Sequence, residues 1–155
     1  MKRLRVYIDT SVIGGCLDPE FAPESRALLE MARTGKVTLV VSDVLGDELE
    51  EAPPAVQKVF DSLSDDCLEY VETGPEEEAL RRRYVESGVV RERSAGDALH
   101  VAAATVARAD MIVSWNFKHI VNYAKIRGFN AVNMREGYFP IEIRSPREVV
   151  SYDEE

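Results

Sequence analysis

Near its beginning the chain carries Leu4-Arg5-Val6-Tyr7-Ile8-Asp9, a short run rich in β-branched and aromatic residues that ends in an acid. Such a run predicts a strand. Apolar runs at 37–41 and 111–113 have a similar character, and helical segments separate them. Strands that alternate with helices predict an α/β fold with a parallel sheet that is covered on both faces.

The remaining elements follow from hydrophobic spacing and from Gly, Pro and Ser boundaries. We expect strands at 4–8, 37–41, 68–71, 111–113 and 131–132, a short helical turn at 10–15, and helices at 23–33, 43–52, 54–63, 75–86, 94–108 and 119–127. The helix at 94–108 is apolar nearly all round, which predicts a central, buried position. The strand at 68–71 is expected at an edge of the sheet.

The length fits one three-layer α/β/α domain, residues 1–155, with a central parallel sheet of four to five strands. We expect its core at about 4–135 and a peripheral C-terminal extension at 136–155. No run approaches the roughly 18 apolar residues of a membrane helix, and Asp9 cuts the first apolar stretch, so no signal peptide is expected. Cys16 and Cys67 lack zinc spacing and disulfide density, which favours reduced thiols in a cytoplasmic protein.

The net charge of −9 disfavours a protein that binds RNA tightly without specificity, because phosphate binding normally requires a basic surface. The charge is unevenly distributed: acids gather at 47–51, 76–78 and 153–155, and bases at 81–83 and at Arg91 with Arg93. A metal ion bound among carboxylates also reverses the sign of the local field. A nuclease therefore remains compatible with this composition.

Two acids stand where ligands bind in parallel sheets, beyond the carboxyl ends of the strands. Asp9 directly follows the first strand, where an ordinary turn or cap residue is the alternative explanation. Glu48 shares the apolar stripe of its helix with Leu45 and Leu49. An inward carboxylate is costly unless it is paired or binds a metal, and a slightly rotated helix that exposes Glu48 is the alternative.

A third acid, Asp97, lies in the first turn of the apolar helix, within Ser94-Ala95-Gly96-Asp97. It can complete a capping box with Ser94 and interact with the helix dipole, and it can also face the sheet edge. If the three acids converge, two carboxylates at roughly 4 Å repel by about 4 kcal/mol at an effective dielectric near 20. A hard cation such as Mg²⁺ or Mn²⁺ removes that repulsion.

Four segments together resemble the PIN-domain family, which includes VapC-type toxins of toxin–antitoxin pairs. These segments are Val6-Tyr7-Ile8-Asp9-Thr10-Ser11, residues 41–49, Gly96-Asp97-Ala98-Leu99-His100-Val101-Ala102-Ala103-Ala104, and Ile112-Val113-Ser114-Trp115-Asn116-Phe117. The resemblance covers roughly residues 4–135. It implies a metal-dependent endoribonuclease that hydrolyses RNA phosphodiesters with Mg²⁺ or Mn²⁺. It also implies an RNA substrate and a homodimer. A cognate antitoxin is expected only if the protein is the toxin of such a pair, which the sequence leaves open.

By this resemblance, the catalytic and metal-binding acids are Asp9, Glu48 and Asp97, and Ser11 and Ser114 are polar supports of the site. Asn116 occupies a fourth metal position, where the family usually has an aspartate. Its amide oxygen can bind a metal or a metal-bound water, but it adds no charge.

Asp110 cannot substitute for that aspartate, because it begins its strand, about 13 Å from the carboxyl end. The sequence therefore also fits a non-catalytic or weakly active module that binds RNA or protein. A phosphatase is a third alternative, but the second aspartate of the haloacid-dehalogenase-like enzymes and a glycine-rich phosphate loop are both missing.

Other residues near these segments each have two interpretations. His100 and His119 could orient a ligand or a phosphate, or could be ordinary hydrogen-bonded histidines at a helix surface. Lys118 and the arginines at 81–83 could contact phosphates, or could be solvated charges. Trp115 could stack on a base or pack on the core.

Overall fold

A computed structural model describes residues 3–154, and within them five parallel strands form one sheet in the order β3-β2-β1-β4-β5. The strands are β1 (Leu4–Ile8), β2 (Val37–Ser42), β3 (Leu68–Val71), β4 (Met111–Val113) and β5 (Glu142–Arg144). The helices are α1 (Thr10–Gly15), α2 (Ala22–Arg33), α3 (Asp43–Glu50), α4 (Pro54–Asp61), α5 (Pro75–Glu86), α6 (Ala95–Val106), α7 (Tyr123–Arg135) and α8 (Pro146–Glu154). The predicted α/β class is confirmed.

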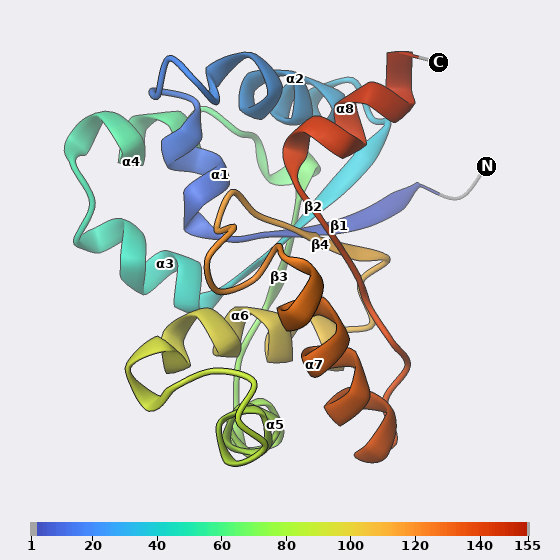
Figure 1. The fold of residues 1–155 in the computed structure, drawn as a ribbon. Coiled ribbons are helices and arrows are strands. Elements are labelled where there is room, and N and C mark those ends of the chain that lie inside the picture. The colour runs from blue at the N-terminus through green and yellow to red at the C-terminus, as the bar shows by residue number, and fades with distance from the viewer. Residues whose placement is uncertain (1–2, 155) are drawn as a thin grey trace.

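Helices cover the sheet on both faces, with α1, α2 and α8 on one side and α5, α6 and α7 on the other (Figure 1). Because successive side chains of a strand point to opposite faces, β1 contributes to both hydrophobic cores. Val6 and Ile8 pack beneath α1 and α2, while Tyr7 packs against α6. The three side chains are fully buried, so β1 is the centre of the molecule.

Several predicted elements are confirmed. Strand β3 lies at an edge of the sheet, and α6 is central, with Ala98, Val101, Ala102 and Ala104 completely buried. None of the helices in residues 3–154 has the length and apolar character needed to cross a bilayer. Cys16 and Cys67 are both buried and form no disulfide.

The strand predicted at 131–132 is wrong, because these residues belong to α7. Phe129, Val132 and Asn133 are buried at helical spacing, and this packing overrides the short apolar run. The helix predicted to start at residue 119 instead starts at Tyr123. Its N-cap is Asn122, whose side chain accepts the backbone N–H of Lys125 at 3.0 Å.

The expected peripheral placement of 136–155 needs correction as well. Residues 142–144 form β5, which pairs with β4, and α8 packs on α2 through Val149 and an Arg147–Glu24 ion pair. Only Ile143 of β5 is buried, between two exposed charged residues. A strand of three residues with this pattern leaves no recognisable signal in the sequence.

Trp115 anchors the segment after β4 to the first two helices. Its indole Nε1 donates to Ser25 Oγ at 2.8 Å, and its ring stacks on Phe21 with 4.2 Å between centroids. Only 6% of the residue is exposed, so Trp115 packs on the core and does not present its face to a base. Gly15 lies against this contact without a side chain of its own.

We expect Gly15→Ala to destabilise the protein by about 1–3 kcal/mol, the usual cost of overpacking. A Cβ at this position would lie 2.6 Å from Ser25 Oγ and 2.7 Å from Trp115 Nε1. Gly14→Ala, in the same helix but with open space around the new methyl group, is the matched control. It should be neutral or stabilise the protein by up to about 1 kcal/mol. Urea unfolding of both variants measures the difference, and equal stabilities would contradict the packing described here.

Candidate active site at the carboxyl edge of the sheet

The sheet register brings polar residues from three neighbouring strands to one edge. Ile8 of β1 pairs with Val113 of β4, so Asp9 and Ser114 follow side by side. The pairing of β1 with β2 places Ser42 on the other side of Asp9. Asp9 therefore occupies the centre of the edge where ligands bind in parallel sheets.

Asp9 is 5% exposed, and each of its carboxylate oxygens accepts a hydroxyl hydrogen bond. Ser11 Oγ donates to Oδ1 and Ser114 Oγ donates to Oδ2, both at 2.6 Å. Burial raises the pKa of Asp9 above its ordinary value, although nearby His100 and the two serine hydrogen bonds lower it. The protein thus holds a carboxylate in one orientation at a place where its charge is costly.

Glu48 reaches the same edge from α3. Its Oε1 accepts a hydrogen bond from Thr10 Oγ1 at 2.5 Å and lies 2.6 Å from His100 Nε2. Burial raises the pKa of Glu48, but the hydrogen bond and charge of His100 and the bond from Thr10 outweigh it, so the pKa is lowered. The side chain is 41% exposed, so it combines the inward and solvent-facing positions that the sequence left open.

His100 is not at the helix surface, as the simpler interpretation of the sequence supposed. It is 2% exposed on α6, and its Nδ1 lies 2.7 Å from the hydroxyl of Tyr7. That hydroxyl also shares a 2.7 Å hydrogen bond with Ser42 Oγ. Ser42 occupies the N-cap of α3, but its hydroxyl binds Tyr7 and caps no helical N–H group.

Asp97 is half-buried in the first turn of α6, and the predicted capping box with Ser94 does not form. Ser94 ends a 3₁₀ turn, Glu92–Ser94, that runs directly into α6, so it lacks the extended backbone that an N-cap normally has. No group in residues 3–154 is seen to hydrogen-bond the Asp97 carboxylate. It therefore remains available to a ligand.

Asn116 closes the turn after β4. Its Oδ1 accepts the backbone N–H of His119 at 2.9 Å, and its own backbone N–H donates to Ser114 Oγ. The hydrogen bond from His119 uses one lone pair of the Asn116 amide oxygen and leaves the other lone pair free. The expected metal position is thus also a structural residue of the loop.

A sequence model of the PIN domain matches residues 5–118, well over half of the chain. The chain belongs to the PIN-domain family. Proteins of this family are generally nucleases that use divalent metal ions, and membership favours nuclease chemistry over the phosphatase alternative.

Among solved structures, a chain in the crystal structure of VapBC2 from Rickettsia felis bound to a promoter DNA fragment has the same fold. The TM-score is 0.59 at 14% sequence identity, and the match covers 92% of this chain and 98% of that chain. No curated protein sequence matches the chain.

The donor set of this PIN domain suits a hard cation. Asp9, Glu48 and Asp97 offer only oxygen atoms, which Mg²⁺ and Mn²⁺ prefer. The buried charge of Asp9 is one that a nearby cation would stabilise. Within the described residues, however, no three His, Cys, Asp or Glu side chains are already arranged around a common point. The site therefore has suitable donor atoms, but they are not arranged in a preformed coordination geometry.

The other candidate residues are largely explained by ion pairing and exposure. Arg83, whose side chain is 54% exposed, pairs with Glu86 and Glu136, as expected for a solvated helix face. Arg81 pairs with Glu78 and Glu92, but only 16% of its side chain is exposed. Lys118 is exposed, and His119 is half-buried beside the Asn116 turn.

Sequence reasoning missed three supporting hydroxyl groups, those of Thr10, Tyr7 and Ser42. Thr10 follows Asp9 directly, and that adjacency was the only available signal. Tyr7 reads as an ordinary core residue, because its hydroxyl partners lie 35 and 93 positions away.

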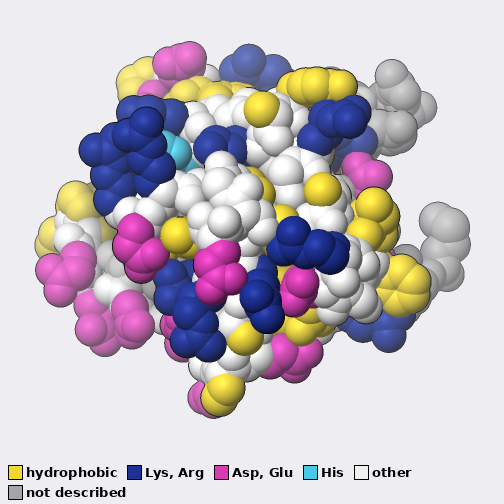
Figure 2. Space-filling model, turned by 60° about the horizontal axis from the view of Figure 1, so that its bottom comes forward, with side chains coloured by type: hydrophobic (Ala, Val, Ile, Leu, Met, Phe, Trp, Pro, Cys, Tyr) yellow, Lys and Arg dark blue, Asp and Glu magenta, His cyan; other side chains and the backbone are white. Residues whose placement is uncertain are grey.

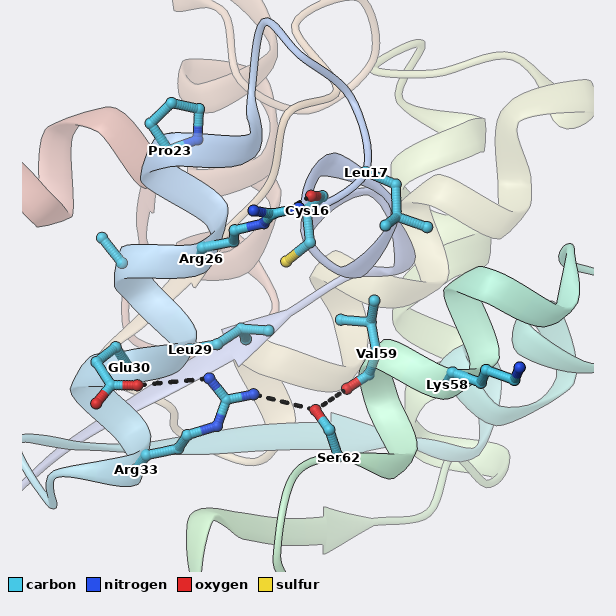
Figure 3. A pocket seen from close by; sticks show the side chains of 11 residues that line it. Cys16, Leu17, Pro23, Arg26, Leu29, Glu30, Arg33, Lys58, Val59 and Ser62 are labelled. Carbon is cyan, nitrogen blue, oxygen red and sulfur yellow. Dashed lines mark hydrogen bonds and ion pairs between the residues drawn. The ribbon is translucent and has the colours of Figure 1, made fainter.

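A separate groove of about 660 Å³ lies between α2 and α4, and none of the predicted site acids lines it. Figure 3 shows Arg33 reaching from Glu30 on α2 to Ser62 after α4, with Arg26 and Lys58 also at the groove. Leu17, Pro23, Ala27, Leu29 and Val59 supply its apolar lining. The groove therefore carries mostly basic charge among apolar lining residues.

In the absence of metal, we expect Asp9→Asn to be more stable than the wild type at pH 7. Because the folded-state pKa of Asp9 is raised, the folded protein binds more protons than the unfolded chain between about pH 3.9 and that raised value. The free energy of unfolding of the wild type therefore falls as pH rises through this window, and asparagine removes that loss.

Urea unfolding in EDTA over a pH series measures this effect, and the advantage of Asp9→Asn should vanish near pH 4 and below. Glu50→Gln is the control, since its exposed side chain is expected to change stability by no more than about 0.5 kcal/mol. A wild type that is as stable as Asp9→Asn at pH 7 would show that the Asp9 charge is not destabilising.

Proposed function

We propose that this PIN domain is a divalent-metal-dependent endoribonuclease. The observation that carries the proposal is the position of Asp9. Its buried carboxylate is held by hydrogen bonds from Ser11 and Ser114 at the centre of the sheet's carboxyl edge. Burial of a carboxylate charge is costly, and the raised pKa of Asp9 shows that its hydrogen bonds do not offset that cost, so this arrangement is best explained by a cation that binds there.

Asp9, Glu48 and Asp97 would hold the ion, with the free lone pair of Asn116 Oδ1 as a neutral fourth donor. The chemistry that such an ion supplies is activation of a water molecule and neutralisation of charge on the phosphate. The chain itself fixes its donors: the two serines hold both oxygens of Asp9, and Thr10 and His100 hold one oxygen of Glu48.

The distribution of surface charge supports an anionic substrate despite the net charge of −9. Figure 2 shows one group of Lys and Arg side chains next to a histidine, while further basic side chains are interspersed with acidic ones over the rest of this face. A local basic group of this kind can attract a phosphate backbone even when the net charge of the chain is negative.

We expect RNA cleavage in Mg²⁺ or Mn²⁺ that stops in EDTA. Asp9→Asn and Glu48→Gln should each lower the rate by about 100-fold or more, equivalent to about 2.7 kcal/mol of transition-state stabilisation. Glu50→Gln, on the same helix as Glu48 but exposed, is the matched control and should cleave normally. The measurement is gel analysis of a mixed structured RNA. Cleavage that persists in EDTA or in both variants would refute the proposed mechanism.

A second candidate is a PIN-like module that binds RNA or protein without cutting it. It is favoured by the absence of a preformed three-donor group among residues 3–154 and by the use of Asn116 Oδ1 in a turn.

In that case the folded wild type would not cleave RNA, whereas Asn116→Asp should acquire metal-dependent cleavage. An aspartate can still accept the His119 N–H while it adds the missing charge. The assay above, run on this variant at equal protein concentration, separates the two candidates. Measurable wild-type turnover would dispose of the binding module.

We extend the proposal to partners and organisation. One chain of the VapBC2 structure shares this fold, and the groove between α2 and α4 has apolar lining residues and three basic side chains, a surface suited to an acidic segment of a protein such as an antitoxin. The homodimer, the single-domain organisation of 1–155 and the cytoplasmic location stay predictions.

A further inference from the structure

His100 is buried, and each of its two ring nitrogens has a hydrogen-bonding partner. A ring with two polar nitrogens is costly to bury unless both form hydrogen bonds. Here Nε2 lies 2.6 Å from Glu48 Oε1 and Nδ1 lies 2.7 Å from the Tyr7 hydroxyl, while 2% of the side chain is exposed. Because a carboxylate can only accept, Nε2 carries a hydrogen and donates it to Glu48.

These hydrogen bonds connect Glu48 through His100 to Tyr7, and the Tyr7 end is fixed to the sheet. Tyr7 belongs to the central strand β1, is fully buried, and shares its hydroxyl with Ser42 Oγ at the end of β2. Its ring meets the His100 ring edge-on, with 5.7 Å between centroids. Two strands therefore help to fix the position of the imidazole that α6 carries.

Glu48 is the flexible member of the arrangement. Its side chain is 41% exposed and comes from α3, a helix of eight residues, so an unrestrained glutamate there would sample several rotamers. Thr10 and His100 both donate to Oε1, and in the described structure Oε2 accepts no hydrogen bond. The contacts thus restrain one oxygen and leave the other for a ligand.

We propose that Tyr7 and His100 are positioning residues, which hold the Glu48 carboxylate in the orientation that binds the divalent ion. This inference rests on the proposed function, since it assigns Tyr7 and His100 roles toward the metal ligand and not toward the RNA. Hydrogen-bonding partners that orient ligands in this way typically contribute 10- to 100-fold to metal affinity. A purely structural role, tying α3 to α6 and β1, is the competing explanation.

The test is titration of the RNA-free protein with Mn²⁺, monitored by isothermal titration calorimetry. Thermal unfolding of each variant shows whether it is folded. We expect His100→Ala to weaken Mn²⁺ binding by about 10- to 100-fold. His100→Gln should recover part of this loss, because its amide can still donate to Glu48. Tyr7→Phe should weaken binding by a smaller factor, about 3- to 10-fold.

The decisive comparison is the double variant of Tyr7→Phe with His100→Ala. If Tyr7 acts only through His100, the double variant binds Mn²⁺ no more weakly than His100→Ala alone. Tyr84→Phe is the matched control, since it also removes a buried tyrosine hydroxyl, one that donates to Asn133 away from the site. It should leave the affinity for Mn²⁺ unchanged.

Each outcome decides a separate question. The positioning role is overturned if folded His100→Gln and Tyr7→Phe both bind Mn²⁺ with wild-type affinity, and His100→Ala either does the same or fails to fold. The nuclease proposal would still stand in that case. Additive losses in the double variant would also overturn the positioning role and favour the structural role. A wild type that binds no Mn²⁺ would overturn the proposed function, and the inference with it. If His100→Ala fails to fold, the losses measured in His100→Gln and Tyr7→Phe carry the test.

Discussion

The parallel pairing of β1 between β2 and β4 is the constraint on which the site depends. This register aligns the ends of three strands, so that Asp9 lies between Ser42 and Ser114 without any help from a loop. The same strand directs Tyr7 to one hydrophobic core and its neighbours to the other. A slip of one residue would exchange these faces and move both Tyr7 and Asp9 out of place. Fold stability and site geometry therefore depend on one set of backbone hydrogen bonds.

Two carboxylates at this edge experience opposite environments. Burial dominates at Asp9 and raises its pKa. At Glu48 burial is outweighed by the hydrogen bonds from His100 and Thr10 together with the charge of His100, so the pKa is lowered. Asp9 is rigid but electrostatically unfavourable, and Glu48 is favourable but depends on its neighbours for orientation. A bound cation would offset the unfavourable buried charge of Asp9, and the oriented carboxylate of Glu48 would serve as a ligand for it. This complementarity is a physical reason for the two acids to differ in their surroundings.

Much of the fold could be predicted from local patterns, because β1, β3 and α5 have clear apolar runs or Pro and Gly boundaries. Asp9, Ser11 and Ser114 come together because strand ends meet at one edge, which the sequence order already implies. The burial of His100 could not be predicted, since its partners Tyr7 and Glu48 are distant in sequence. The three-residue β5 was missed for a related reason: its pairing with β4 is set by tertiary contacts and not by its own residues.

Strand β5 has a practical consequence for the design of shorter fragments. The family match ends at residue 118, yet the backbone N–H of Ser114 donates to the carbonyl of Arg144, 26 positions beyond that boundary. A fragment cut at the family boundary would leave the β4 edge unpaired, and unpaired edges invite association between chains. It would also lose a restraint on the residue that binds Asp9. Expression of this PIN domain as a minimal unit therefore needs residues through β5, and α8 as the cover of α2.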